Sequence, residues 1–277
     1  MTFLYWNLNG MDLTDPTMRI ATRHEVDVIA LIEVGDGRDR LNSELCSQQK
    51  VYHLAEGPLP EDESEFMVFT RFPSEFMPLV HSEQRMILRR VQLAGKLEIL
   101  FVLVHLMPKA YQSEAEREQS FETPLHSAKI AEIEGGDEHP KTIVVGDFNM
   151  NPFEPSMVAG VGFNAVMTRR IAESKKEQRE VCGPKYRYFY NPMWGRFGDT
   201  TAGPGGTYFF DHSGHHINYY WNIFDQVLLR PALLPYFDHK DLDIVTHDGQ
   251  NSLLTSAGRP DADSASDHLP LLFKLSL

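Results

Sequence analysis

Short apolar stretches separated by polar residues recur along the whole chain, and their lengths and composition predict β-strands. They are rich in β-branched and aromatic side chains and end at polar or glycine-containing turns. The stretches lie at 2–6, 26–32, 66–70, 86–93, 97–104, 143–145, 223–229 and 271–275. The stretch 26–32 is apolar almost throughout, which is typical of a strand that is covered on both faces. A hairpin turning at 94–96 is expected to join 86–93 to 97–104.

Segments with helical character alternate with these strands. Asp15 and Pro16 predict the start of a helix that runs to about His24, and 36–50 reads as a polar loop followed by a helix. Two further helices are predicted at 113–119 and 124–134, the second with Thr123 as its cap. The alternation favours an α/β protein with sheets covered by helices.

Polar side chains stand where several of the predicted strands end. Asn7 and Asn9 follow the first strand, Glu33 follows 26–32, and His105 follows 97–104. A glutamate that closes a buried strand needs compensation for its charge. A metal ion or a buried arginine would compensate the charge of Glu33, and simple exposure to water would make compensation unnecessary. His105 has a structural alternative as well, because a single histidine at a strand end is often structural.

The stretch 143–149 combines three β-branched residues with Gly146, Asp147, Phe148 and Asn149. Side chains alternate along an extended chain, so Asp147 and Asn149 are expected to point to one side and Phe148 to the other. This pair of side chains suits the orientation of a water molecule and a charged oxygen. Taken alone, the same residues also fit an ordinary turn.

Composition limits the classes of partner. The 277 residues are 42% hydrophobic, with a net charge of −13 and a sequence pI of about 5.3. An acidic chain has no general attraction for nucleic acid or anionic membranes, so a polyanionic substrate needs a local basic patch or a metal ion. Cys46 and Cys182 have no metal-ligand spacing and read as reduced thiols. With no targeting segment visible and no apolar run long enough to span a bilayer, we expect a cytoplasmic protein without stable membrane association.

The segment 169–222 differs from its surroundings because it is rich in arginine, lysine and aromatic residues. Basic and aromatic side chains together suit a phosphate chain with stacked bases, and Tyr190 and Trp194 are the predicted stacking residues. The alternative is an insertion whose aromatic rings are buried against the core. The polar run 211–216 has no regular zinc-ligand spacing and is read as a loop tip.

The polar motifs, taken in chain order, resemble those of the endonuclease/exonuclease/phosphatase superfamily, in its deoxyribonuclease-I-like form. The motifs are 7–10, Glu33, His105, 146–149, the strand around Asp225, and 266–268, and they span residues 2–275. The resemblance implies one catalytic domain over 1–277, with a basic-aromatic insertion at 169–222. Its fold would be a four-layer sandwich of two mixed β-sheets packed face to face, with helices outside.

The resemblance also implies a metal site. Glu33 would be the principal Mg²⁺ ligand, with Asn7 and Asp267 close to the ion or its waters. Carboxylate oxygens and retained waters are the ligands that Mg²⁺ prefers, and Mn²⁺ would serve as a substitute.

The remaining motif residues carry implied catalytic roles. Asp147 would orient or deprotonate the attacking water, and Asn149 and His268 would hold phosphoryl oxygens. Asp225 would fix the ring of His268, and His105 would protonate or stabilise the leaving oxygen.

We therefore expect a Mg²⁺-dependent phosphoester hydrolase, with nuclease activity on phosphodiesters as the leading hypothesis and Asn9 in contact with substrate. The alternatives are a phosphatase or phosphodiesterase acting on a small molecule or a lipid headgroup, and a binding protein with an inactive site. The tyrosine-and-asparagine pattern of the apurinic-endonuclease branch is absent near His105, which argues against abasic-site cleavage. Two features depart from the family: Ile32 stands where glutamine often precedes the metal glutamate, and the aromatic segment 186–221 has no counterpart. The insertion matches no known specificity loop, so the fold alone does not decide the substrate.

Overall fold

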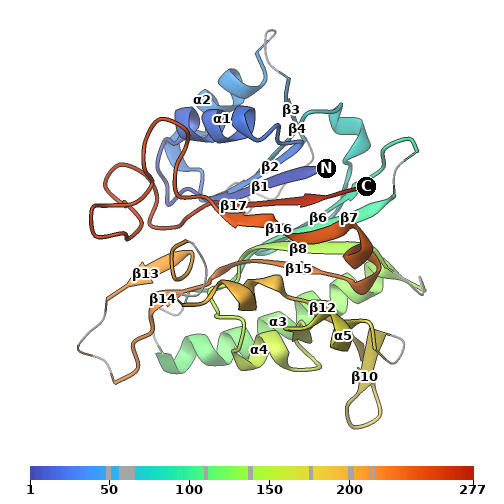
Figure 1. Cartoon of the computed structure of the whole chain (residues 1–277). Helices are drawn as coiled ribbons and strands as arrows, with labels where there is room; N and C mark the ends of the chain where they lie inside the picture. The colour runs from blue at the N-terminus through green and yellow to red at the C-terminus, as the bar shows by residue number, and fades with distance from the viewer. Residues whose placement is uncertain are drawn as a thin grey trace.

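Two mixed β-sheets, of six and seven strands, lie face to face with helices on the outside (Figure 1). The computed structural model describes residues 1–47, 51–55, 66–95, 97–108, 112–136, 140–174, 177–198, 203–211, 214 and 216–277, with the backbone only at 112–121. The predicted sandwich is therefore confirmed.

The six-stranded sheet unites the two ends of the chain. Its strands, in spatial order, are β16 (Phe237–Ile244), β17 (Leu271–Leu275), β1 (Thr2–Asn7), β2 (Val28–Ile32), β4 (Met67–Thr70) and β3 (His53–Leu54). β1 runs parallel to β2 and antiparallel to β17. Two helices lie beside this sheet, α1 (Thr14–Arg23) and α2 (Arg38–Leu45), and they bury Ile20 and Leu41 in the core.

The seven-stranded sheet carries the middle of the chain. Its spatial order is β5 (Leu79–Glu83), β6 (Met86–Val91), β7 (Ile99–His105), β8 (Thr142–Asp147), β15 (Asp225–Leu229), β12 (Phe189–Tyr190) and β9 (Ala165–Val166). The helices α3 (Gln112–Glu134), α4 (Pro155–Val158) and α5 (Arg169–Ala172) lie on this side of the sandwich (Figure 1). The prediction of two separate helices before β8 is wrong, because α3 continues through Pro124. A proline inside a helix removes one hydrogen bond, and packing elsewhere can outweigh that loss.

The remaining elements are short and were not predicted. They are the hairpins β10 (Gln178–Glu180) with β11 (Lys185–Arg187) and β13 (Tyr208–Phe210) with β14 (Tyr220–Asn222), and the 3-10 helices η1 (Gly35–Gly37), η3 (Ser74–Phe76), η5 (Pro192–Arg196) and η6 (Pro231–Tyr236). Some residues of the basic and aromatic segment 169–222, which includes the polar run 211–216, lie outside the described residues, among them Lys175, Lys176, His212, Ser213 and His215. None of the described helices is both long and apolar enough to cross a membrane.

The alternation of side chains along β7 explains its unbroken apolar sequence. Phe101 and Leu103 point into the core between the sheets, where the ring of Phe101 stacks on Phe3 with centroids 5.8 Å apart. Val102 and Val104 point the other way, into a second apolar cluster that includes Ile130 of α3. Because both faces are covered, no position of this strand can be polar until the strand ends.

Strand register brings the ends of five strands to one edge of the sandwich. Asn7 of β1 lies opposite Ile32 of β2, immediately before Glu33. In the other sheet His105 lies opposite Asp147, and Asp147 lies opposite Asp225. Polar residues that are far apart in sequence therefore become neighbours at this edge.

Candidate active site

The backbone at this edge is turned sharply by residues in left-handed conformations. Asn9, Glu33 and Asn149 have φ angles of 49°, 48° and 49°. Asparagine tolerates this region, whereas a glutamate there is uncommon, and such strain concentrates at functional sites. The turns at 7–10 and 33–35 are packed so closely that a Cβ on Gly35 would lie 2.3 Å from the carbonyl oxygen of Gly10.

Gly146 is required by the same close packing. Its φ is +155°, and a Cβ at this position would lie 1.9 Å from the carbonyl oxygen of Val104 on the neighbouring strand. The glycine thus lets β8 run against β7 up to the point where Asp147 leaves the sheet.

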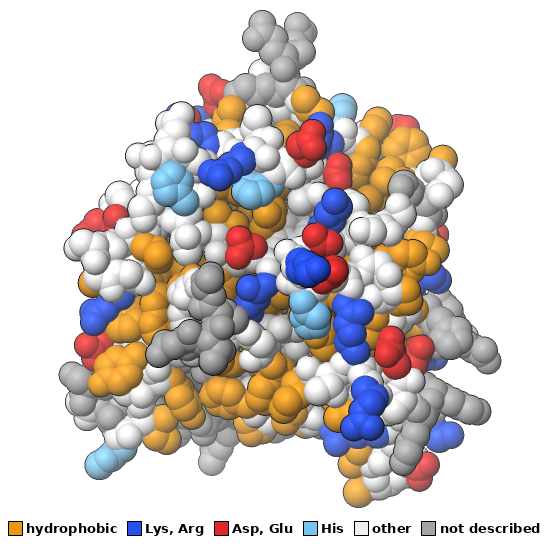
Figure 2. All heavy atoms as spheres, viewed as in Figure 1, with side chains coloured by type: hydrophobic (Ala, Val, Ile, Leu, Met, Phe, Trp, Pro, Cys, Tyr) orange, Lys and Arg blue, Asp and Glu red, His pale blue; other side chains and the backbone are white. Residues whose placement is uncertain are grey.

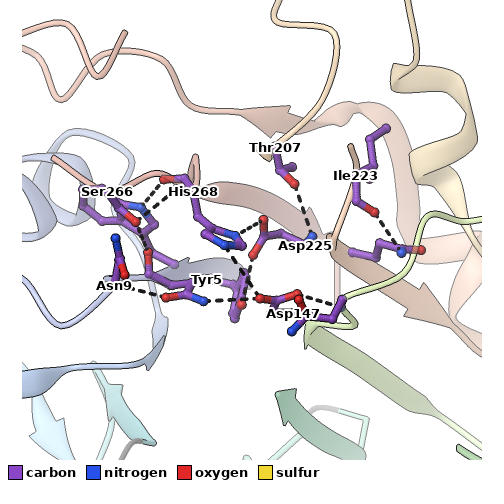
Figure 3. Close-up of polar contacts among 12 residues, drawn as sticks. Tyr5, Asn9, Asp147, Thr207, Ile223, Asp225, Ser266 and His268 are labelled. Carbon is purple, nitrogen blue, oxygen red and sulfur yellow. Dashed lines mark hydrogen bonds and ion pairs between the residues drawn. The ribbon is translucent and has the colours of Figure 1, made fainter. Parts of the chain in front are cut away.

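A buried acid–histidine pair forms the centre of the site. His268 Nδ1 lies 2.8 Å from Asp225 Oδ2, and Tyr5 donates its hydroxyl to Asp225 Oδ1 at 3.1 Å (Figure 3). The other ring nitrogen, Nε2, points toward Asp147, with 3.8 Å to Oδ2. Burial by itself lowers the pKa of His268, but the carboxylates of Asp225 and Asp147 outweigh it and raise that pKa to about 10.

Asp147 lies between the two halves of the site. Its Oδ1 accepts the backbone N–H of Asn149 at 2.7 Å, and its Oδ2 accepts Nδ2 of Asn7 at 3.3 Å. Burial raises the pKa of this carboxyl group to about 6, in spite of the nearby histidines. A carboxylate with a pKa in this range suits a general base at neutral pH.

Glu33 is held by two side chains from other strands. Its Oε1 accepts Nδ2 of Asn7 at 3.0 Å and lies 3.2 Å from Nε2 of His105. The hydrogen bond with His105 lowers the pKa of Glu33, as does the bond with Asn7, although burial opposes both. Among the described residues no arginine contacts Glu33, so the arginine partner considered from the sequence is absent from this part of the structure.

The loop after His105 is fastened by α3 and by the turn between β5 and β6. Glu122 accepts the backbone N–H of Met107 at 3.4 Å and lies 3.7 Å from the guanidinium of Arg85. Arg85 in turn donates to the carbonyl oxygen of His105. These contacts fix the direction in which His105 leaves β7.

The donor set suits a divalent cation. Ligand atoms of Glu33, His105 and Asp147 lie within 4.8 Å of one another, and so do those of Asp147, Asp225 and His268. Asp267 Oδ1 is shielded from solvent and has no hydrogen-bond partner among the described residues, and burial raises the pKa of this carboxyl group. A buried carboxylate oxygen without a donor is a destabilising feature that a bound cation would relieve.

The structure describes each of the other predicted site residues. Asn7 Oδ1 accepts the backbone N–H of Asn9 at 2.9 Å, and the side chain of Asn9 is exposed. Nδ2 of Asn149 donates to the carbonyl oxygen of Leu106 at 2.8 Å, which joins the loop after β8 to the loop after β7. Asp147 and Asn149 do diverge from Phe148, whose ring packs against Phe163 in the core, as predicted.

The assignment of Tyr190 as an exposed stacking residue is wrong. Its side chain is 2% exposed, and its hydroxyl lies 2.8 Å from Nε2 of His239. Tyr190 also pairs with Leu229, the last residue of β15. Asp225 is the first residue of that strand, so Leu229 and Asp225 lie roughly 13 Å apart along it. Trp194 is half-buried in η5, with its ring against Phe153.

Two described arginines of the 169–222 segment, Arg169 and Arg179, are likewise engaged away from the site. Arg169 donates to the carbonyl oxygens of Leu234 and Phe237, and Arg179 donates to Asn164 and to the carbonyl of Val158. These arginines satisfy backbone and side-chain acceptors within the fold. The alternative of rings buried against the core therefore holds for Tyr188, Phe189 and Tyr190, while other aromatic residues of the segment remain exposed.

Tyr5 and Tyr208 were not predicted as site residues, and Ser266 belonged to the last motif without a predicted role. Tyr5 stands two positions before Asn7 on the same face of β1, and this period-two spacing was the available signal. Ser266 donates to the carbonyl oxygen of Asn7 at 2.7 Å, and so connects the last motif to the first. The ring of Tyr208 lies 4.7 Å from that of His268, and burial, with the negative charges of Asp267 and Asp147, raises the pKa of Tyr208 to about 12.

Sequence comparison finds no relative: no family model matches, and no curated protein is similar in sequence. Similar folds are found among solved structures. An endonuclease/exonuclease/phosphatase family protein from Bacteroides thetaiotaomicron is 14% identical with a TM-score of 0.56, with 99% of this chain and 97% of that chain covered. TDP2 from D. rerio in complex with a single-strand DNA product is 16% identical with a TM-score of 0.54 and the same coverage. Sphingomyelinase C from Streptomyces griseocarneus is 14% identical with a TM-score of 0.53, with 99% of both chains covered.

These neighbours match the chain over nearly its full length. Their identities are low enough that the likeness concerns the fold alone. The chain shares the fold of solved endonuclease/exonuclease/phosphatase family proteins, and the polar residues predicted from its sequence gather at one edge of the sandwich.

Proposed function

We propose that this protein is a Mg²⁺-dependent phosphoester hydrolase, and that its substrate is a nucleic-acid phosphodiester. One observation carries the proposal: a continuous series of polar contacts from His105 through Glu33, Asn7 and Asp147 to His268 at one edge of the sheets. The fold neighbours support it, since they include TDP2 with a single-strand DNA product and a sphingomyelinase. We also propose that residues 1–277 act as one catalytic domain.

Glu33 and Asp267 would hold the metal ion, with Asn7 beside them. A bound Mg²⁺ supplies positive charge that polarises a phosphoryl oxygen and offsets developing negative charge. The fit rests on two observations: Oδ1 of Asp267 is shielded and has no hydrogen-bond partner among the described residues, and burial, helped by the nearby charge of Glu33, raises the pKa of Asp267. Glu33 also belongs to a cluster of donor atoms with His105 and Asp147, although Asp267 is not part of that cluster.

The protein side chains would orient the reactants and move the protons. Asp147 would accept a proton from the attacking water at Oδ2, while Asn7 and the backbone of Asn149 keep the carboxylate in place. His268, protonated on both ring nitrogens, would donate from Nε2 to a phosphoryl oxygen and keep its Nδ1 proton on Asp225. His105 would deliver a proton to the leaving oxygen from Nε2, which lies 3.2 Å from Glu33.

The test is hydrolysis of a substrate panel by purified protein with Mg²⁺: single-stranded DNA, duplex DNA, RNA, nucleotides and phospholipid headgroups. Activity should vanish with chelator, return with Mg²⁺ or Mn²⁺, and be lost in Glu33→Gln. The matched control is Asp243→Asn, which removes one exposed acidic charge from β16 away from the site and should leave activity unchanged. Full activity of Glu33→Gln in Mg²⁺ would refute the metal assignment.

A second candidate is hydrolysis of a small-molecule or lipid-headgroup phosphate. The net charge of −13 favours it, because a long polyanion is repelled by an acidic protein. The same panel separates the two functions by rate. A protein that binds members of the panel without hydrolysing any of them would be a binding protein with an inactive site.

A further inference from the structure

Three aromatic rings gather around Phe153, and the four rings together come from three segments of the chain. The ring centroid of Phe153 lies 5.5 Å from Tyr219, 5.7 Å from Phe197 and 6.2 Å from Trp194. These distances are typical of rings in edge-to-face or tilted contact. We call Phe153, Trp194, Phe197 and Tyr219 the aromatic platform.

The platform is open to solvent on one side. Phe153 is 38% exposed and Tyr219 is 56% exposed, whereas Trp194 and Phe197 are half-buried beneath them. Figure 2 shows hydrophobic side chains gathered on the lower part of the molecular face, in the half of the molecule where Figure 1 labels β14. Packed aromatic residues that still present their rings to water are a common feature of binding surfaces.

The platform lies near the candidate active site along the chain. Phe153 follows Asn149 by four residues, so it lies within about 14 Å of it. The loop between them is fixed, because Asn151 donates to the side chain of Asn222 at 2.9 Å and accepts the backbone N–H of Ile223 at 2.9 Å. Ile223 lies two residues before Asp225, so this anchor sets the platform relative to the residues that would act on the phosphoester.

Cationic side chains are scarce around the platform, and the two that the structure describes there are engaged: Arg196 of η5 donates to the carbonyl oxygens of His239 and Leu242, and Arg259 lies over the ring of Phe209. Neither 142–168 nor 197–229 has a single lysine or arginine. Contacts to phosphates are made chiefly by such residues, and duplex binding depends on them. A ligand held here must therefore be held through its apolar or aromatic parts. An unpaired base offers an aromatic face, whereas the bases of a duplex are stacked on one another.

We propose that the aromatic platform stacks an unpaired nucleobase of the substrate beside the phosphoester to be cleaved, so that the protein acts on single-stranded or frayed nucleic acid. This inference rests on the proposed function and adds the substrate class. Stacking of one base typically strengthens binding several-fold to about a hundredfold. Because few phosphates are neutralised by protein cations on this side, binding should weaken only slightly with salt.

The experiment compares two substrates and two kinds of variant. The substrates are a single-stranded oligonucleotide and a strand of equal length with tetrahydrofuran abasic units in place of the nucleosides. The variants are Phe153→Leu and Tyr219→Leu, which keep an apolar side chain but remove the ring. The control is Met167→Leu, which changes a 52% exposed residue adjacent to β9, outside the platform. Binding is measured by fluorescence anisotropy in chelator, and hydrolysis is measured separately in Mg²⁺.

The wild type and the control should bind the base-bearing strand several-fold to about a hundredfold more tightly than the abasic strand. Phe153→Leu and Tyr219→Leu should lose that preference, with a raised KM for the base-bearing strand and a nearly unchanged kcat. Equal affinity of the wild type for both strands overturns the proposal, as does a steep loss of affinity with salt. Binding to phosphatidylcholine vesicles that disappears in the same two variants, without base preference, would show a lipid-docking surface instead and would also overturn it.

Failure of this inference is distinguishable from failure of the proposed function. Hydrolysis of phosphodiesters without base preference would leave the hydrolase proposal intact and remove the platform from it. Base-dependent binding without any hydrolysis would support the platform as a base-binding surface and contradict the hydrolase proposal.

Discussion

Replacing Asp225 by asparagine is the most discriminating perturbation of the proposed mechanism. The carboxylate is fully buried, lies 2.8 Å from Nδ1 of His268 and accepts the hydroxyl of Tyr5. Asp225→Asn keeps the volume of the side chain but removes the negative charge and replaces one acceptor oxygen by an NH2 donor. A loss of activity would therefore report both the charge of Asp225 and its hold on the tautomer of His268.

The magnitude follows from the geometry. Two unit charges about 4 Å apart interact by about 4 kcal/mol at an effective dielectric constant of about 20. That free energy corresponds to roughly a thousandfold change in the proton affinity of His268. Since the pKa of His268 is raised to about 10 against the desolvating effect of burial, loss of the Asp225 charge should bring this pKa much closer to neutral. If protonated His268 stabilises the transition state, kcat should fall by about 10²-fold or more.

The assay is the pH dependence of kcat with Mg²⁺ held constant, for the wild type, Asp225→Asn and His268→Ala. A histidine that must be protonated loses function as pH rises through its pKa, so Asp225→Asn should move the alkaline limb of the profile to lower pH. Asp243→Asn controls for the change in net charge and should leave that limb in place. Thermal melting confirms that each variant is folded.

The double variant decides whether the two residues act together. Residues that act as a unit give losses that do not add, so Asp225→Asn with His268→Ala should be little worse than His268→Ala alone. Strictly multiplicative losses, or an alkaline limb that stays in place in Asp225→Asn, would refute the idea that Asp225 works through His268.

Three further predictions concern stability and the corrected assignments. Gly146→Ala should lower the melting temperature by about 6 °C or more, because the new Cβ would lie 1.9 Å from the carbonyl oxygen of Val104 and such overpacking costs about 3 kcal/mol. An unchanged melting temperature would contradict the conclusion that this position requires glycine. Arg230→Met should lower the free energy of unfolding in urea by about 3–5 kcal/mol, because the side chain of Glu134, which is 2% exposed, loses its ion-pair partner. Adding Glu134→Leu should restore much of that loss. A double variant no more stable than Arg230→Met would argue against this pair. Tyr190→Phe should cost about 1 kcal/mol of stability through its lost hydrogen bond and leave KM for an oligonucleotide unchanged, so a raised KM would return Tyr190 to the substrate site.

Much of the fold could be predicted from the sequence because its strands are buried on both faces. Residues 99–104 of β7 and 143–145 of β8 alternate between the core cluster between the sheets and the cluster that contains Ile130 of α3, so their apolar sequence is continuous and the strands are recognisable. The strand β16 was missed for the opposite reason. It lies at an edge of its sheet and buries only some of its side chains, so its sequence is as polar as that of a loop.

The candidate site was partly predictable for a similar reason. A polar residue directly after a buried strand stands out, and this identified Glu33, His105 and Asp147. Strand register in the structure then decides that these residues are neighbours. Tyr5 escaped notice because a tyrosine within an apolar strand has the composition of core, and only the position of Asp225 across the sandwich gives its hydroxyl a partner.

The insertion shows what only the tertiary structure could decide. Composition groups Tyr190 with Tyr219 in one aromatic-rich segment, but it carries no information about which side chains meet water. Tyr190 is buried because β12 joins the sheet at the end of β15 remote from Asp225, whereas Tyr219 is exposed because it precedes the short strand β14 at the other end. Exposure and proximity to a site depend on contacts between segments far apart in sequence. Those contacts follow from the packing of the whole chain and leave no local trace in the order of its residues.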